Sequence, residues 1–149
     1  MPERRIEYQT VQQTADSGFV ITAPSLQRLY IDAALSLTDQ MVQLDLLGTP
    51  EKRTLSVSAE NRTALMAKWL TEILTLFQKD KILCKRIVFN TFDGKSITAT
   101  IFGEPYQPVK HGSVPEFKVN EGQLQIGDQQ NPEPQFFAKI FLSRKVSTK

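Results

Sequence analysis

The chain has 149 residues, a length at which a single domain buries roughly 70% of the surface of its unfolded chain. Its hydrophobic fraction of 40% and charged fraction of 23% are ordinary for a globular protein, which excludes a disordered tail, a collagen-like repeat and a disulfide-stapled mini-protein. Eighteen basic residues against sixteen acidic ones give a net charge of +2, too small to support non-specific binding of nucleic acid through bulk charge.

Targeting signals are not evident. No apolar run approaches the roughly 20 residues that span a bilayer. The first five residues include three charged ones and no apolar stretch follows them, unlike a signal peptide. We therefore expect a cytoplasmic protein with one domain over residues 1–149. The single cysteine, Cys84, excludes an intramolecular disulfide, and we expect it to be a half-buried small apolar residue.

Two helices are predicted from apolar residues that recur at helical spacing. The first begins after Ser25, a favoured N-cap that follows Pro24. The second begins near Asn61, another favoured N-cap. The two apolar stripes are Leu26, Leu29, Tyr30, Ala33, Leu37 and Met41, and Leu65, Met66, Trp69, Leu70, Ile73, Leu74 and Phe77. We expect both stripes, including Trp69, to face the core.

The strands are shorter than the helices. In chain order they are predicted over residues 19–22, 54–59, 86–92, 96–102, 117–119, 124–126 and 136–142. Asp93 and Gly94 separate the third and fourth segments and predict a tight hairpin with positive φ at both turn positions. This order predicts an α+β fold with two helices packed on one face of a mostly antiparallel sheet.

Residues that could carry chemistry are few. A Gly-rich phosphate loop and the GxSxG, HExxH and CxxC motifs are absent. The single histidine, His111, lies between prolines, and we expect a surface residue without a partner. Asp16 precedes the first strand, Asp39 lies late in the first helix and Asp45 follows it. Carboxylates at a strand start and a helix end can bind a hard cation, although Asp in a turn is also ordinary turn chemistry.

Four stretches, taken in chain order, resemble the archease family. They are Thr-Ala-Asp at residues 14–16, where the family has His-Thr-Ala-Asp; the first helix and its ending at residues 25–42; the strand and helix of residues 58–70; and Gly103-Glu104 with Lys110-His111, whose spacing to residues 116–118 matches the family. In the first helix an acidic residue precedes a Met-Val pair, as in the family. The resemblance spans nearly the whole chain in one consistent order.

The resemblance implies an archease-like domain of strand-helix-strand-strand order with an inserted segment. It also implies a role as a non-enzymatic accessory protein of the GTP-dependent RNA ligase that acts in tRNA splicing and RNA repair. Archeases promote guanylylation of the ligase histidine and so support repeated turnover. They carry a small acidic patch that binds a metal such as calcium. The protein partner would be the ligase, RNA would be met only indirectly, and no membrane would be involved.

Carried over position by position, the resemblance gives a metal set of Asp16, Asp39 and Ser143, and a partner-binding set of Gln13, Lys118, Glu104 and His111. Two of these positions depart from the family. Gln13 stands where the family has histidine, and an amide cannot act as a protonatable imidazole. Ser143 stands where the last strand of the family ends in aspartate. Because calcium usually takes about 6–8 oxygen ligands, we expect this cation site to be weakened or lost.

Two other interpretations stay open. The chain could be a diverged archease-fold interaction module that has lost the metal site and serves another protein. It could also be a small enzyme that uses the polar end as a pocket, an interpretation that the single histidine and single cysteine disfavour.

Overall fold

The computed structural model describes residues 9–13, 16–112, 114, 117–130 and 135–144. In chain order the elements are β1 (Gln9–Gln13), β2 (Asp16–Ala23), α1 (Leu26–Met41), the 3-10 turn η1 (Leu44–Leu46), β3 (Glu51–Ser58), α2 (Arg62–Asp80), β4 (Ile82–Phe92), β5 (Ser96–Pro105), α3 (Pro108–His111), β6 (Phe117–Val119), the 3-10 turn η2 (Glu121–Gln123), β7 (Gln125–Gln129) and β8 (Gln135–Arg144). The predicted α+β class is confirmed.

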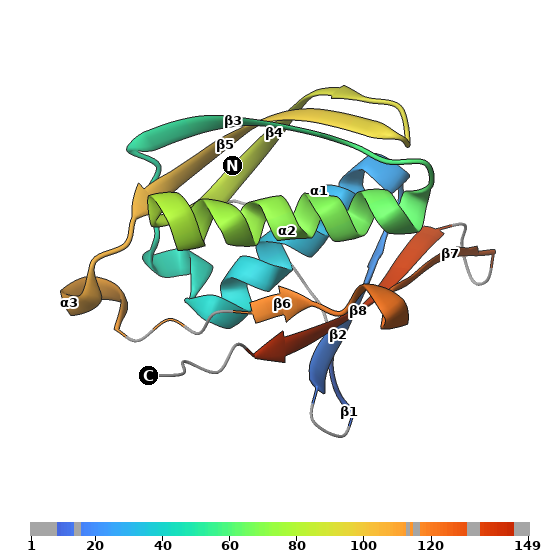
Figure 1. The fold of residues 1–149 in the computed structure, drawn as a ribbon, viewed down its shortest axis with the longest axis horizontal. Helices are drawn as coiled ribbons and strands as arrows, with labels where there is room; N and C mark the ends of the chain where they lie inside the picture. The colour runs from blue at the N-terminus through green and yellow to red at the C-terminus, as the bar shows by residue number, and fades with distance from the viewer. Residues whose placement is uncertain (1–8, 14–15, 113, 115–116, 131–134, 145–149) are drawn as a thin grey trace.

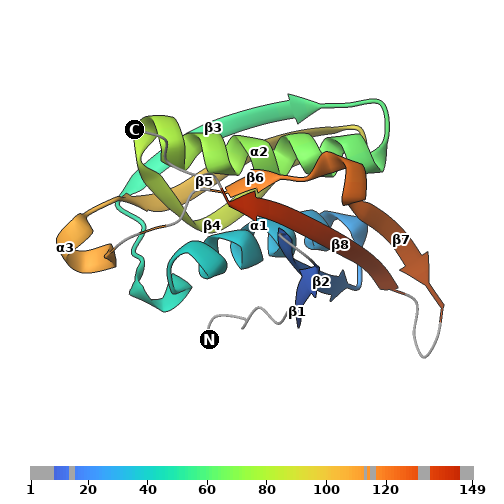
Figure 2. The ribbon, with the colours of Figure 1, turned by 60° about the horizontal axis from the view of Figure 1, so that its bottom comes forward.

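The strands form two antiparallel sheets, and the two long helices lie between them. Sheet A has the order β1-β2-β8-β6, with β7 also paired to β8, and sheet B has the order β3-β5-β4. Helix α1 contacts β2 and β8 of sheet A and β4 of sheet B, while α2 contacts all of sheet B as well as β6 and β7. Figure 1 shows sheet B above the helices and sheet A below them, and Figure 2 shows the same layers turned. The predicted packing of two helices on antiparallel strands is present, but the strands divide into two sheets and the helices lie between them.

Both long helices begin where the sequence predicts. The Oγ of Ser25 accepts a hydrogen bond from the N–H of Arg28 at 3.1 Å, and the Oδ1 of Asn61 accepts one from the N–H of Ala64 at 2.8 Å. These side chains satisfy donors that the first helical turn leaves unpaired. In the described part of the chain, no helix is long and apolar enough to cross a membrane.

The core joins the two helices through aromatic side chains. Trp69 is fully buried, as predicted, and its Nε1–H donates to the carbonyl of Tyr30 at 2.8 Å. The hydroxyl of Tyr30 donates to the carbonyl of Arg62 at 2.7 Å, and its burial raises the pKa of the phenol. The ring of Trp69 meets Phe89 of β4 edge to face, with ring centroids 5.4 Å apart. These contacts tie α1, α2 and sheet B into one core.

Cys84 is buried rather than half-buried, with 2% of its surface exposed. It lies at the start of β4, among buried residues of the core. Burial raises the pKa of its thiol to about 12, so the thiol is protonated at neutral pH. Cys84 is therefore a core residue and supplies no nucleophile.

The strand predictions hold, with differences at the edges. Every predicted segment overlaps an observed strand, and the hairpin between β4 and β5 is present. Its turn differs, because only Gly94 has a positive φ, of 88°. Asp93 instead accepts hydrogen bonds from the N–H groups of Lys95 and Ser96, and these lower the pKa of its carboxyl. The polar strand β1 and the short helix α3 were not predicted, since neither has an apolar period to reveal it.

Candidate functional site

The structure distributes six of the seven predicted site residues over two places, and the seventh, Asp39, lies in the last turn of α1. The first is the end of β5 together with α3, and it holds Glu104 and His111. The second is one end of sheet A, and its residues are Gln13, Asp16, Lys118 and Ser143. In both ribbon views α3 stands apart from β6 and β8, so the two places are separate (Figures 1 and 2).

Glu104 is the centre of a hydrogen-bonded network at the end of β5. Only 7% of its side chain is exposed. Its Oε1 accepts from the N–H of Gly48 at 2.8 Å and from the Nζ of Lys110 at 2.9 Å. Its Oε2 lies 2.8 Å from the same Nζ and 2.5 Å from the Nε2 of His111. Both carboxylate oxygens are thus fully engaged, which is what a buried carboxylate requires.

His111 is a buried member of this network, so the expectation of a surface histidine without a partner was wrong. The N–H of Gln107 donates to its Nδ1 at 2.9 Å, which places the ring proton on Nε2, facing Glu104. The ring also stacks on Tyr106 at a centroid distance of 5.9 Å and an angle of 22°. Helix α3 turns His111 toward Glu104. The segment between the prolines was interpreted as a loop, and this contact was therefore not predicted.

The charges around Glu104 set its protonation state. Burial raises the pKa of this carboxyl, but hydrogen bonds from Lys110, the Gly48 N–H and His111 outweigh burial and lower the pKa to about 2. Glu104 is therefore ionised at neutral pH. The network fastens α3 and the segment around Gly48 to β5. Because every partner donates a hydrogen bond to Glu104, neither carboxylate oxygen is left to act as a base in proton transfer.

Asp39 lies in the last turn of α1 and helps to hold the segment that joins α1 to β3. Its Oδ1 accepts from the N–H of Leu44 at 3.1 Å, and the Nζ of Lys85 donates to the carbonyl of Leu44 at 2.8 Å. Glu104 holds the same segment further on, through Gly48. Charged side chains from α1, β4 and β5 therefore fasten this connection. Sequence reasoning missed Lys85 and Gly48, because the partners lie 41 and 56 residues apart along the chain.

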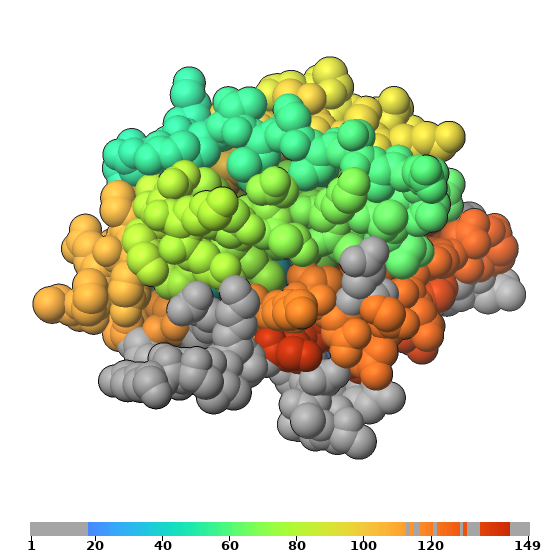
Figure 3. All heavy atoms as spheres, viewed as in Figure 1, coloured from blue at the N-terminus to red at the C-terminus, as the bar shows by residue number. Residues whose placement is uncertain are grey.

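The end of sheet A brings Lys118 and Ser143 together. They are paired residues of β6 and β8, while Ser17 of β2 pairs with Leu142 of β8. Asp16 therefore follows at the next position along the β2–β8 ladder. Lys118 is exposed and both of its neighbours in β6 are buried, so its side chain points away from the helices. Figure 3 shows β6 (orange) and β8 (red) at the surface below α2.

Gln13 pairs with Asp16 across the β1–β2 hairpin, which places their backbones side by side. The side chains of both residues lie outside the described part of the structure. Among the side chains that are described, no three or more of His, Cys, Asp and Glu gather as metal ligands. Of the three residues expected to bind the metal, only Asp39 and Ser143 have described side chains, and these are one carboxylate and one hydroxyl.

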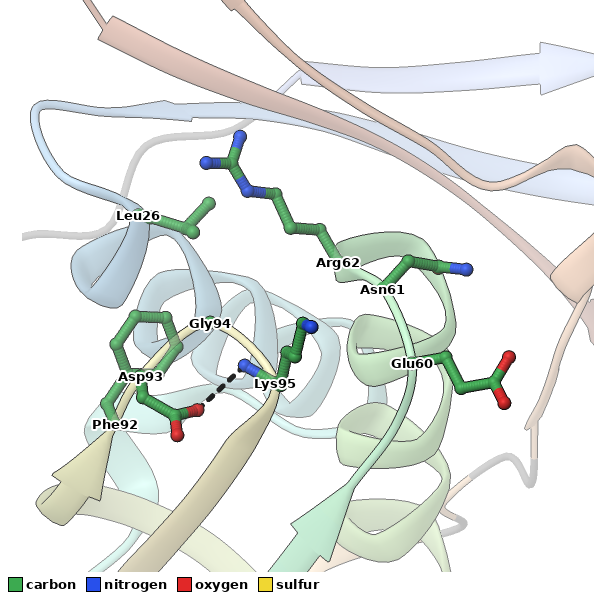
Figure 4. Close-up of a pocket in the computed structure, with 8 residues that line it drawn as sticks. All are labelled: Leu26, Glu60, Asn61, Arg62, Phe92, Asp93, Gly94 and Lys95. Atoms are coloured by element: carbon green, nitrogen blue, oxygen red, sulfur yellow. Dashed lines mark hydrogen bonds between the residues drawn. The ribbon is translucent and has the colours of Figure 1, made fainter.

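A hollow of about 530 Å³ opens at another part of the surface. Figure 4 shows it between the start of α1, the start of α2 and the β4–β5 hairpin, and its lining residues are Leu26, Glu60, Asn61, Arg62, Phe92, Asp93, Gly94 and Lys95. None of the predicted site residues lines it. The polar end of sheet A and this hollow are therefore different features.

The fold and its networks define a small α+β protein in which two helices lie between antiparallel sheets and charged side chains fasten the connections. The sequence model of the archease protein family (MTH1598/TM1083) matches residues 8–127. The chain belongs to the archease family. The resemblance found in the four sequence stretches is thereby confirmed.

Individual relatives agree with this assignment. The archease of Methanosarcina mazei is 25% identical over 131 residues, which cover 85% of this chain and 90% of that protein. The archease of Methanothermobacter thermautotrophicus is 30% identical over 94 residues, or 61% of this chain and 67% of that protein.

Two solved structures share the fold. Protein 1598 of Methanobacterium thermoautotrophicum matches with a TM-score of 0.72 and 24% identity, and the match covers 91% of this chain and 97% of that one. An archease from Thermotoga maritima, described as a possible chaperone, matches with a TM-score of 0.59 and 12% identity over 98% of this chain and all of that one.

Proposed function

We propose that this chain is a non-enzymatic accessory protein that promotes guanylylation and turnover of a GTP-dependent RNA ligase of tRNA splicing and RNA repair. Membership of the archease family over residues 8–127 carries this proposal. A chaperone role, suggested for the Thermotoga maritima relative, also implies a protein partner.

The end of sheet A is the surface that would meet the ligase. Lys118 is exposed there beside Ser143, and Asp16 follows on the adjacent strand. Glu104 and His111 are buried, so in this proposal they act by holding α3 rather than by touching the partner. The exposed residues of α3, which are Pro108, Val109 and Lys110, are then available for contact.

For the metal, we propose that a divalent cation such as calcium binds only weakly or not at all. The chemistry of the donors supports this. Ser143 offers a neutral hydroxyl in place of a carboxylate, and the residue paired with it, Lys118, is a cation. Calcium sites are tuned over orders of magnitude in Kd by the number of charged ligands, so the loss of one carboxylate is expected to be severe.

Ser143→Asp is expected to bind calcium about tenfold more tightly than the natural chain, because it restores a charged oxygen ligand. Isothermal titration of both proteins measures this, with Ser56→Asp on exposed β3 as the matched control. Tight stoichiometric binding by the natural chain, abolished by Asp16→Ala, would contradict the proposal.

The ligase proposal is tested by multiple-turnover RNA joining with limiting ligase from the same organism, GTP, divalent metal and RNA ends. We expect this chain to stimulate turnover, Asp16→Ala to lose most of the stimulation and Asp80→Ala to retain it. Asp80 is the matched control because it is an exposed aspartate at the end of α2. No stimulation by the folded protein would instead favour a diverged interaction module, the alternative that Gln13 and Ser143 support.

A further inference from the structure

Sheet B has one face on the helices and one face toward solvent. Along β5, Ile97, Ala99 and Ile101 are buried, and the helices that contact the sheet do so on this side. The residues between them point the other way, together with alternate exposed residues of β3 and β4. We call this second side the outer face of sheet B.

The outer face carries positive charge and an aromatic ring at one end. Lys52 of β3 and Arg86 of β4 are both paired with Phe102 of the central strand β5. The guanidinium carbon of Arg86 lies 5.3 Å from the centroid of the Phe102 ring, over its face. Lys52 and Arg86 are exposed, and Phe102 is half-buried. Arg86 and Phe102 make a cationic and aromatic platform, and Lys52 adds a second cation on the strand at the other side of Phe102.

The rest of the outer face is rich in hydroxyl groups. Thr100 is paired with Thr54 and Thr98 with Ser56, and the amide of Asn90 donates to the hydroxyl of Thr100 at 3.1 Å. Among the outward-facing positions of the three strands, all of which the structure describes, the one that holds a carboxylate is Glu104, two residues beyond Phe102. Glu104 is buried, and its carboxylate is neutralised by Lys110. The exposed part of the face thus offers hydrogen bonds and positive charge without an exposed acidic group to repel an anion.

We propose that the outer face of sheet B binds single-stranded RNA directly, without the ligase. Phosphates would meet Lys52 and Arg86, a base would stack on the Arg86–Phe102 platform, and the threonine hydroxyls would meet base edges and ribose hydroxyls. A single strand is favoured over a duplex because only an unpaired base can leave its stack to pack on this platform.

The dimensions and charge agree with this ligand. The eight residues of β3 extend for about 26 Å at a rise of about 3.3 Å per residue, enough for a few nucleotides. A net charge of +2 gives no bulk attraction, so binding would depend on where the cations lie. The proposal goes beyond the ligase role and does not rest on it.

Fluorescence anisotropy with a labelled single-stranded RNA of about 12 nucleotides, at about 50 mM salt, tests this proposal. We expect the natural chain to bind and Lys52→Glu/Arg86→Glu to weaken binding at least about tenfold. The matched control is Lys68→Glu/Lys79→Glu, two exposed lysines of α2 with the same total charge change, and it is expected to keep most of the affinity. Circular dichroism verifies that each variant is folded.

Phe102→Ser is expected to weaken binding about tenfold while leaving its salt dependence unchanged, since it removes stacking and no charge. Absence of binding by the natural chain, or equal losses in the two double variants, would overturn the proposal. Displacement of the RNA by poly-glutamate as readily as by unlabelled RNA would also overturn it, in favour of an acidic protein partner. Asp16→Ala is expected to retain RNA binding, so this proposal and the ligase proposal can fail separately.

Discussion

Replacement of Glu104 by glutamine is expected to lower the free energy of unfolding by about 2–3 kcal/mol and the melting temperature by roughly 5–10 °C. The amide keeps the shape of the side chain but loses the charge. One carbonyl oxygen cannot serve Gly48, Lys110 and His111 together, and the amide N–H₂ would face another donor. The result is a buried group left without its partner.

The pH dependence of stability gives this prediction a second readout. The pKa of Glu104 is lower in the folded protein, at about 2, than its ordinary value of 4.5. Its contribution is therefore complete above the unfolded pKa and declines as the pH falls from about 4.5 toward 2. Chemical denaturation from pH 7 to pH 3 should show the variant and the natural chain converging at low pH. Glu60→Gln, at an exposed position, is the control. A constant difference at every pH would contradict this account of the network.

Gly103→Ala is expected to destabilise the protein by about 3 kcal/mol, near the upper end of overpacking effects. A Cβ at this position would overlap the carbonyl oxygen of Leu83 and lie 3.0 Å from its carbonyl carbon. These are backbone atoms of the paired strand β4, so they cannot rotate away. The close approach of β5 to β4 here also positions Glu104, the next residue.

Thermal unfolding measures the effect of Gly103→Ala, with Gly122→Ala as the matched control. At Gly122 the nearest atom to a new Cβ, the Oδ1 of Asn120, lies 3.8 Å away. We expect the control to change the melting temperature little. Similar melting temperatures for the two variants would show that the β4–β5 contact does not restrict residue 103.

The sequence predicted the helices best, because their signals are local. Ser25 and Asn61 cap α1 and α2 as their residue types suggest, and the apolar stripe of α2 correctly placed Trp69 in the core. The division into two sheets was missed. Alternation identifies a strand, but it does not say which strands pair, and the pairing of β2 with β8 joins opposite ends of the chain.

The network around Glu104 shows why a candidate site is harder to predict. Glu104 and His111 were both selected through the family resemblance, but their mutual contact depends on the short helix α3. Gly48 joins the network through its backbone N–H, and because every residue except proline has such a donor, the residue type gives no sign of it. At the end of sheet A, the pairing of Lys118 with Ser143 likewise depends on a register that only the folded chain reveals.

The most direct test of the central claim is the transfer of labelled guanylate from GTP to limiting ligase, measured with and without this chain. The account predicts that the chain accelerates labelling of the ligase, carries no label itself and loses this effect in Asp16→Ala. An unchanged rate of ligase labelling, with the folded chain in excess over a ligase from the same organism, would contradict it.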